Sequence, residues 1–310
     1  MSKPILVTGA AGNVGSVGRI VVDRLRLWDL PVRALVRQDD ARAEALRATG
    51  AEVIVADLTK PNEVIKAVEG CQSIYFGMSV SPQYLEATMI VAAAAVRQGE
   101  IEALVNMSQM TVGEMTLASM TDSPQHKQHW LAEQALNWSG LPVVHIRPTV
   151  FLNHPFFSEW ASESINDNDT IRLPFGQGKS SPISAEDVAS VITTVLGDPS
   201  AHVGQVYELT GPRSLDMNEM AKEYSEALGR TIKYVDMPFD EWQEKELNKR
   251  ELPQHLADHF ITMAKLHAEN RYDRLTQDFL SVVGQEAKGV RSYIAHRSDL
   301  FKVSAATPAS

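Results

Sequence analysis

The chain has 310 residues, of which 44% are hydrophobic and 22% are charged, so it is a folded protein of one large domain or two coupled ones. A balance of 29 Lys and Arg against 39 Asp and Glu gives a net charge of −10, which repels nucleic-acid phosphates and anionic lipid headgroups. Cys71 is the single cysteine, which excludes an intramolecular disulfide, and no Cys/His set has zinc-site spacing. No apolar stretch is long enough to span a bilayer, so we expect a cytoplasmic protein with no nucleic-acid, membrane or metal partner.

Short apolar runs alternate with amphipathic segments through the first half of the chain. The runs predict strands at 4–9, 32–37, 52–57, 73–77, 103–108 and 143–147. Helical spacing predicts helices around 20–27, 41–48, 62–68, 85–97 and 125–138. This alternation is typical of an α/β fold with a Rossmann-like, doubly wound parallel sheet. We therefore predict a dinucleotide-binding domain at 1–150.

The alternation loosens after Pro148. Aromatic residues stand between polar turns over 151–182, which predicts a cap rather than another layer of sheet. A helix at 185–196 and a strand at 206–210 return the chain to the first domain over 183–211, and a helix at 217–228 opens a mainly helical remainder. We predict that 151–182 and 212–310 form a smaller substrate cap.

A glycine-rich turn follows the first strand directly. Backbone N–H groups at a helix N-terminus bind a pyrophosphate, and glycines let the phosphate come close. The turn is predicted to bind a dinucleotide, the alternative being a glycine turn that binds nothing. A second register, Gly12, Gly15 and Gly18, remains open. In the first register Gly12→Val or Gly15→Val is expected to abolish dinucleotide binding while the protein stays folded, and Gly18→Ala is expected to be milder. The predicted contacts are Gly9, Ala11, Gly12, Asn13, Val14 and Gly15.

The end of the second strand is expected to select the cofactor. Arg37 stands at the first position beyond the strand, and Asp39 and Asp40 follow. An acid here commonly binds the ribose 2′-hydroxyl, whereas a guanidinium pairs with the 2′-phosphate. We predict NADP(H) in preference to NAD(H), with a solvated Arg37 as the alternative. Asp57 and Leu58 follow the third strand, where Asp57 fits either an adenine contact or an N-cap.

Taken together, these motifs resemble the NmrA-like, atypical branch of the short-chain dehydrogenase/reductase superfamily, which includes NAD(P)H-dependent quinone and triarylmethane-dye reductases. The segments that carry the resemblance are 7–15, 34–37, 50–53, 56–58, 67–70, 139–142, 146–148 and 209–212. The resemblance spans about the whole chain and implies a Rossmann-like fold that binds NAD(P)H. One departure is the extra stretch 16–18 before the helix body.

The acid–base pair of typical superfamily members is missing from this sequence. None of the seven tyrosines is followed four positions later by a lysine. In the NmrA-like branch the helix before the sixth strand often carries a His or Lys one turn before a Glu, which His129 and Glu133 match. The resemblance therefore implies a catalytic or ribose-binding His129, with a surface histidine as the alternative. Ser108 matches the substrate-positioning serine, or is an ordinary turn residue.

Ligands of this architecture bind beyond the carboxyl ends of the strands, which gathers further candidates on one rim. The aromatic members of the cap fit an apolar substrate wall or the core of the cap. His126 and His129 lack a third ligand for a metal, and His145 fits a core residue better than a catalyst. The remaining cofactor candidates are Gly77, Met78, Ser79 and Pro148, and the substrate candidates are Phe151, Asn153, Phe156, Phe157 and Trp160.

Two functions are consistent with these features. The first is an NAD(P)H-dependent reductase that passes hydride to a small aromatic or conjugated acceptor such as a quinone, a dye or an unsaturated carbonyl. The second is a non-catalytic NAD(P) sensor that acts through a protein partner. The expected partner of the reductase is a small aromatic substrate, and the expected assembly is a monomer or a homodimer.

Overall fold

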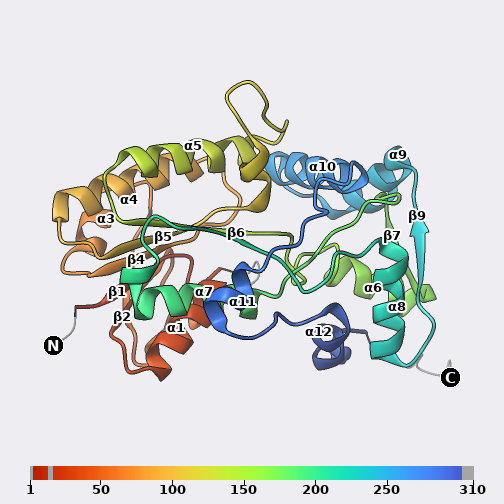
Figure 1. Ribbon diagram of the computed structural model, residues 1–310, viewed down its shortest axis with the longest axis horizontal. Coiled ribbons are helices and arrows are strands. Elements are labelled where there is room, and N and C mark those ends of the chain that lie inside the picture. Colours follow the sequence, from red (N-terminus) through yellow and green to blue (C-terminus); the bar gives the residue numbers. More distant parts are fainter. Residues whose placement is uncertain (1–2, 13–16, 302–310) are drawn as a thin grey trace. The chain divides into compact units, whose positions relative to one another are not determined.

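The computed structural model describes residues 3–12 and 17–301, and the chain divides into two compact units (Figure 1). Unit 1 comprises Met1–Pro148, Ala185–Leu209 and Thr276–Glu286. Unit 2 comprises Thr149–Ser184, Thr210–Leu275 and Ala287–Ser310. Each unit has a hydrophobic core of its own.

Unit 1 is built on a parallel sheet in the order β3-β2-β1-β4-β5-β6-β8. The chain runs outward from β1 to β3 and then returns to the other side of β1 as β4, so the loops after β1 and β4 diverge. A crevice that binds ligands forms at this point of such sheets, at the carboxyl ends of the strands. The strands are β1 (Ile5–Val7), β2 (Val32–Val36), β3 (Glu52–Val55), β4 (Ser73–Phe76), β5 (Ala103–Met107), β6 (Val143–Pro148) and β8 (Val206–Leu209).

Helices cover both faces of this sheet. α1 and α7 pack together on one face, and α3, α4 and α5 lie side by side on the other (Figure 1). Apolar side chains such as Leu6, Ile74 and Val91 fill the core between the sheet and α3 and α4. The helices of unit 1 are α1 (Val17–Leu27), α2 (Ala41–Arg47), α3 (Pro61–Val68), α4 (Tyr84–Gln98), α5 (Pro124–Trp138), α7 (Ala185–Gly197) and α11 (Asp278–Val283), with short helical turns at Met110–Glu114 and Pro199–Ala201.

Unit 2 is mainly helical around an aromatic core that includes Phe156 and Trp242, both fully buried. Its two strands, β7 (Thr170–Leu173) and β9 (Lys233–Asp236), form a parallel pair. The helices are α6 (Glu159–Asn168), α8 (Met217–Leu228), α9 (Phe239–Trp242), α10 (Gln254–Ala268) and α12 (Val290–His296), with short helical turns at Gln243–Leu247, Asn248–Arg250 and Ser298–Phe301.

The predicted α/β fold is confirmed: the strands and helices expected through 148, the helices at 185–196 and 217–228, and the strand at 206–210 all form. Two features depart from the expected organisation of the cap. The β7–β9 pair was not predicted, because each strand is only four residues long and carries polar residues. The segment 276–286 belongs to unit 1, where α11 packs on α7 and Asp278 Oδ2 accepts the Glu208 N–H at 2.7 Å.

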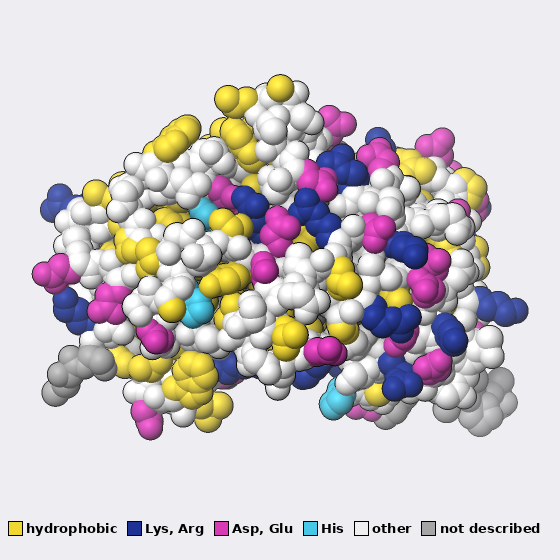
Figure 2. Space-filling model, viewed as in Figure 1, with side chains coloured by type: hydrophobic (Ala, Val, Ile, Leu, Met, Phe, Trp, Pro, Cys, Tyr) yellow, Lys and Arg dark blue, Asp and Glu magenta, His cyan; other side chains and the backbone are white. Residues whose placement is uncertain are grey.

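Charged side chains of both signs are interspersed on the face in Figure 2. In the described part of the chain, every helix is too short or too polar to cross a membrane.

Candidate functional site

The glycine turn after β1 is closed and tightly packed at Gly9. Gly9 has a φ of +66°, and the Gly12 N–H donates to its carbonyl oxygen at 3.1 Å. A Cβ at Gly9 would lie 2.6 Å from the carbonyl oxygen of Gly77. Both the positive φ and the contact require glycine, so the loop after β4 approaches the turn more closely than a side chain would allow.

Thr8 joins the two loops and was not identified from the sequence. Its hydroxyl donates to the carbonyl oxygen of Gly77 at 2.8 Å and accepts the Gly77 N–H at 2.9 Å. Gly77 is itself required, since a Cβ there would lie 2.6 Å from the buried hydroxyl of Tyr75. A threonine directly after a buried strand was the only local signal for this contact.

Gly18 packs the N-terminal turn of α1 against the glycine turn. A Cβ on Gly18 would lie 2.7 Å from the Gly9 carbonyl oxygen and 3.0 Å from the Ala10 nitrogen. Gly18→Ala is therefore expected to disturb the fold, because backbone atoms would have to move, while its effect on dinucleotide binding stays a prediction. Gly18 thus allows a close contact between the start of α1 and the turn after β1. Asn13, Val14 and Gly15 lie outside the described residues.

The acids after β2 are bound by residues of α2. Asp40 is the N-cap of α2, and its side chain accepts hydrogen bonds from the backbone N–H groups of Arg42 and Ala43. The hydrogen-bonded side chain of Arg42 lowers the pKa of Asp40. Asp39 pairs with Arg47 at 2.8 Å. Both carboxylates thus have partners in α2.

Two arginines stand near the end of β2. Arg37 is exposed at the end of the strand, where the sequence placed the contact to the 2′-phosphate. Arg42, which was not predicted, reaches the glycine turn, where it donates to the Ala11 carbonyl oxygen at 3.0 Å. Its guanidinium lies beside the turn because the α2 N-cap positions the first turn of that helix.

The side chain of Asp57 shapes the entry to α3. Its Oδ1 accepts the Thr59 N–H at 2.9 Å and the Thr59 hydroxyl at 2.8 Å. These hydrogen bonds lower the pKa of Asp57. Glu63 accepts the Asp57 N–H, and Leu58 packs on the core of unit 1. The N-cap of α3 is Lys60, so the N-cap alternative for Asp57 is wrong, and its side chain instead stabilises the turn at Thr59. The adenine contacts of Asp57 and Leu58 stay predictions.

Two glutamines of α5 hydrogen-bond the loop after β4. The Ser81 N–H donates to Gln125 Oε1 at 3.0 Å, and Gln128 Nε2 donates to the Ser81 carbonyl oxygen at 3.3 Å. The cofactor candidates Met78 and Ser79 precede this fixed point, with Met78 half-buried and Ser79 exposed. The loop is therefore tied to Thr8 at one end and to α5 at the other.

Ser108 lies at the carboxyl end of β5, beside the end of β6. Its N–H donates to the Ile146 carbonyl oxygen at 2.8 Å, and its side chain is 3% exposed. Within residues 3–12 and 17–301, the Ser108 hydroxyl oxygen has no hydrogen-bond partner. A buried hydroxyl without a partner at this edge fits a polar group of a bound ligand. Pro148 ends β6 on the same edge and is buried.

His129 is linked to this edge through Tyr84. The His129 and Tyr84 rings lie 4.1 Å apart between centroids, and the Tyr84 hydroxyl donates to the Met107 carbonyl oxygen at 3.0 Å, next to Ser108. Burial raises the pKa of Tyr84 well above its usual value, so its hydroxyl stays protonated. Tyr84 thus contacts one predicted catalytic residue, His129, and hydrogen-bonds the residue that precedes the other, Ser108.

Glu133, the other half of the pattern around His129, has a structural partner. It is 1% exposed and accepts two hydrogen bonds from Arg147, the shorter at 2.6 Å. His145 is fixed in the same layer, because its ring nitrogens contact Asn106 at 3.1 Å and Asn137 at 3.0 Å. The prediction that His145 is a core residue is confirmed.

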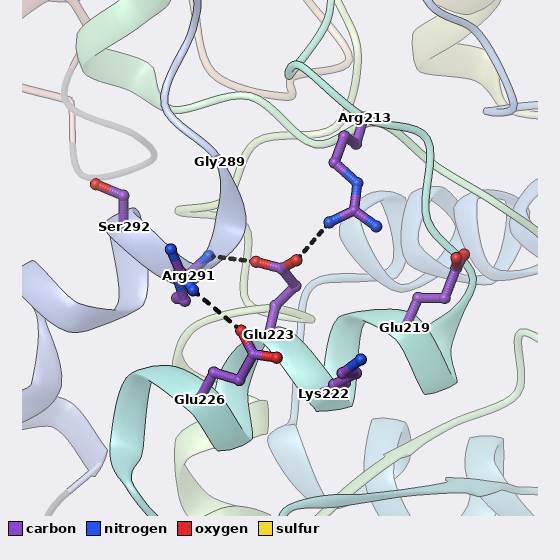
Figure 3. A pocket seen from close by; sticks show the side chains of 8 residues that line it. All are labelled: Arg213, Glu219, Lys222, Glu223, Glu226, Gly289, Arg291 and Ser292. Atoms are coloured by element: carbon purple, nitrogen blue, oxygen red, sulfur yellow. Dashed lines mark hydrogen bonds and ion pairs between the residues drawn. The ribbon is translucent and has the colours of Figure 1, made fainter.

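Unit 2 carries a polar pocket of about 490 Å³ (Figure 3). Glu223 accepts from the Arg213 guanidinium at 2.6 Å and from the Arg291 N–H at 3.2 Å, while Arg291 pairs with Glu226 at 3.2 Å. Its basic and acidic side chains are equal in number, so it offers no net charge to an anionic cofactor. The lining residues are Arg213, Glu219, Lys222, Glu223, Glu226, Gly289, Arg291 and Ser292.

The model of the NmrA-like family matches residues 1–293. The chain belongs to the NmrA-like family. The resemblance seen in the sequence is thereby confirmed.

Relatives of this NmrA-like protein include both enzymes and a regulator. It is 30% identical to an NAD(P)H azoreductase of Xenophilus azovorans over 82% of this chain and 84% of that protein. Its fold matches an NADPH-dependent quinone oxidoreductase of Escherichia coli complexed with NADPH, with a TM-score of 0.82, 20% identity and coverage of 95% and 99%. It also matches NmrA, a negative transcriptional regulator, in complex with NADP, with a TM-score of 0.79, 18% identity and coverage of 95% and 94%.

The substrate candidates of this NmrA-like chain lie in unit 2. Phe156, Phe157 and Trp160 are at most 9% exposed, and the Phe156 ring makes edge contacts with Trp160 and Phe175. Phe151 and Asn153 are half-buried. The core alternative accounts for the first three aromatics, and a substrate role for the five residues stays a prediction.

Proposed function

We propose that this NmrA-like protein is an NADPH-dependent reductase that transfers hydride to a small aromatic or conjugated acceptor, such as a quinone or an azo dye. The observation that carries the proposal is the close packing of the Gly9 and Gly77 backbones, which leaves no room for a side chain at Gly9. These glycines follow β1 and β4, the two strands between which the strand order reverses. Such a backbone cradle at a helix N-terminus suits a pyrophosphate. The named azoreductase and quinone oxidoreductase relatives support the reductase chemistry.

The residues present fit a dinucleotide. Gly9, Gly12 and the N-terminus of α1 would receive the pyrophosphate, and Thr8 holds the opposite wall at Gly77. Arg37 would bind the 2′-phosphate, with Arg42 as a second cation. This assignment supports a preference for NADPH over NADH, because Asp40 already caps α2 and Asp39 already pairs with Arg47.

The chemistry depends on positioning. Bound NADPH supplies the hydride. In this chain the buried Ser108 hydroxyl would hold a polar group of the cofactor or acceptor, and His129 would assist the proton that accompanies hydride transfer. The sequence has no Tyr-x-x-x-Lys pair, which suits electron-poor acceptors that stabilise the incoming charge themselves.

The test separates enzyme from sensor. Purified protein is titrated with NADPH by calorimetry and then assayed for NADPH oxidation against a panel of quinones, azo dyes, cationic dyes and unsaturated carbonyls. Binding with oxidation of at least one acceptor supports the reductase. Binding without oxidation by any acceptor favours the sensor, whose case rests on the missing acid–base pair and the NmrA-like regulator fold. Absence of NADPH binding would remove both functions.

A further inference from the structure

Gln125 stands between the loop after β4 and His129. It is 4% exposed and lies one turn before His129 on α5. Its amide makes two contacts: Oε1 accepts the Ser81 N–H at 3.0 Å, and Nε2 lies 3.1 Å from His129 Nε2. One buried side chain therefore contacts both the loop after β4 and His129.

The roles of these atoms follow from hydrogen-bond chemistry. A backbone N–H can only donate, so the amide oxygen of Gln125 must face Ser81 and its NH₂ group must face His129. An NH₂ group can only donate, so His129 Nε2 must accept. An accepting Nε2 carries no proton, which leaves the proton of the neutral ring on Nδ1.

We propose that Gln125 is a positioning residue that holds His129 as the neutral Nδ1–H tautomer and couples that state to the position of the loop at Ser81. Protonated His129 would present an N–H to the NH₂ group of Gln125. Gln125 would then have to turn over, which would place an NH₂ group against the Ser81 N–H. Two donors that face each other lose a hydrogen bond and remain desolvated, which is unfavourable. The contact between Gln125 and Ser81 and the neutral state of His129 therefore stabilise each other.

The surroundings of His129 are consistent with this arrangement. Tyr84 of α4 faces the ring and stays protonated, since burial raises its pKa. Glu133, one turn further along α5, is bound to Arg147 of β6. The Gln125 amide, whose Nε2 lies 3.1 Å from His129 Nε2, specifies that this nitrogen accepts. The relevance of this coupling to turnover rests on the proposed reductase function, whereas the tautomer itself does not.

The tautomer can be read directly by long-range ¹H–¹⁵N NMR of the histidine rings in the full-length protein without cofactor. The His129 signals are assigned by their loss in His129→Ala. The expected result above the titration range is an unprotonated Nε2 and a protonated Nδ1. A protonated Nε2 in the wild-type protein overturns the proposal, whatever the activity of the protein.

Two substitutions test the role of Gln125. Gln125→Leu is expected to abolish the fixed Nδ1–H state and to lower the protection of the Ser81 amide against hydrogen exchange. Gln125→Glu offers acceptors to both Ser81 and the imidazolium, so the pH midpoint of the His129 titration should rise by about 1 unit or more. Gln128→Leu is the matched control, because it removes the other contact to Ser81 and should leave the His129 tautomer unchanged. An unchanged tautomer in Gln125→Leu overturns the proposal.

Activity provides the second readout. In the presence of an accepted quinone, Gln125→Glu should shift the pH profile of kcat in the same direction as the NMR titration. A shifted NMR titration with no shift in the kcat profile limits Gln125 to the free protein and overturns its role in turnover. Failure of the wild-type protein to oxidise NADPH contradicts the proposed function alone, because the NMR measurement does not depend on it.

Discussion

The hydroxyl of Thr8 hydrogen-bonds both backbone groups of Gly77, at 2.8 Å to the carbonyl oxygen and 2.9 Å from the N–H. Thr8 follows β1 and Gly77 follows β4, so this one side chain continues the pairing of the two strands beyond their last backbone hydrogen bond. This contact joins the two loops that flank the reversal of strand order.

Thr8→Val is expected to lower the free energy of unfolding by about 1–3 kcal/mol, because it keeps the shape of the side chain and leaves buried backbone groups of Gly77 without partners. Urea unfolding measures the change. NADPH affinity should fall as well, since the wall opposite Gly9 is loosened. Thr8→Ser keeps the hydroxyl and serves as the control; equal stability of the Val and Ser variants would contradict the role of the hydroxyl.

Gly18→Ala is expected to destabilise the protein by about 1–3 kcal/mol, as overpacking in a well-packed region does. The added methyl group would meet the backbone of Gly9 at 2.7 Å, and backbone atoms cannot turn away as a side chain can. Gly197→Ala in α7 is the matched control, because its nearest neighbour is the half-exposed ring of Trp28, which can move. Thermal unfolding that ranks the control below Gly18→Ala in stability would contradict the packing role.

Arg37→Ala is expected to reduce the preference for NADPH over NADH by about 10–100-fold, because charge-assisted hydrogen bonds to a phosphate contribute about 1.5–3 kcal/mol. Fluorescence titration with each cofactor measures the ratio of the two Kd values. Arg97→Ala, in the last turn of α4, is the control for a simple change in net charge. Equal affinity of the wild-type protein for the two cofactors would contradict the role of Arg37 and would assign the contact with the ribose to Asp39 or Asp40.

Unit 2 should lose stability in mild acid through His267. Burial lowers the pKa of His267 to about 4, between the stacked rings of Phe175 and Tyr272. Its unfolded pKa is near 6.5, so the unfolded chain binds a proton that the folded chain does not. The contribution of neutral His267 to the free energy of unfolding is fully present above about pH 6.5. It is lost progressively between about pH 6.5 and pH 4, a loss on the order of 3 kcal/mol.

His267→Phe keeps an aromatic ring in the stack and removes the titration, so the difference in unfolding free energy between pH 7 and pH 5 should shrink. Urea unfolding at the two pH values measures it. His296→Gln, at the exposed end of α12, is the control. A pH dependence that is the same in both variants would assign the acid sensitivity to other groups, such as the buried His154 and His259.

Periodicity was sufficient to predict the sheet and its helices, because each buried strand reads as a short apolar run. It could not reveal that Thr8 binds Gly77, since 69 residues separate them and a hydroxyl after a strand has many uses. The packing of Gly18 could not be predicted for a related reason: it depends on how α1 meets the turn. Gln125 and Gln128 were missed because glutamines on a helix usually face solvent, and only the fold brings Ser81 to them.

The reductase proposal makes its sharpest prediction at His129. The ring lies against Tyr84, whose hydroxyl donates to the Met107 carbonyl oxygen next to Ser108, and under the proposed function we expect His129 to assist the proton that accompanies hydride transfer. Orientation of donor and acceptor should still contribute most of the rate, because the Tyr-x-x-x-Lys pair is missing. His129→Ala is therefore expected to lower kcat with a quinone by roughly 10–100-fold, which is less than the 10²–10⁴-fold loss expected for an essential general acid.

NADPH affinity should change little in His129→Ala, since the predicted pyrophosphate and 2′-phosphate contacts lie on other elements. Stopped-flow absorbance of NADPH oxidation separates the chemical step from cofactor binding, and His202→Ala, on the connection before β8, is the control. Complete loss of oxidation in His129→Ala would make His129 the essential proton donor rather than an assisting residue. An unchanged rate would mean that solvent supplies the proton and that His129 only packs against Tyr84.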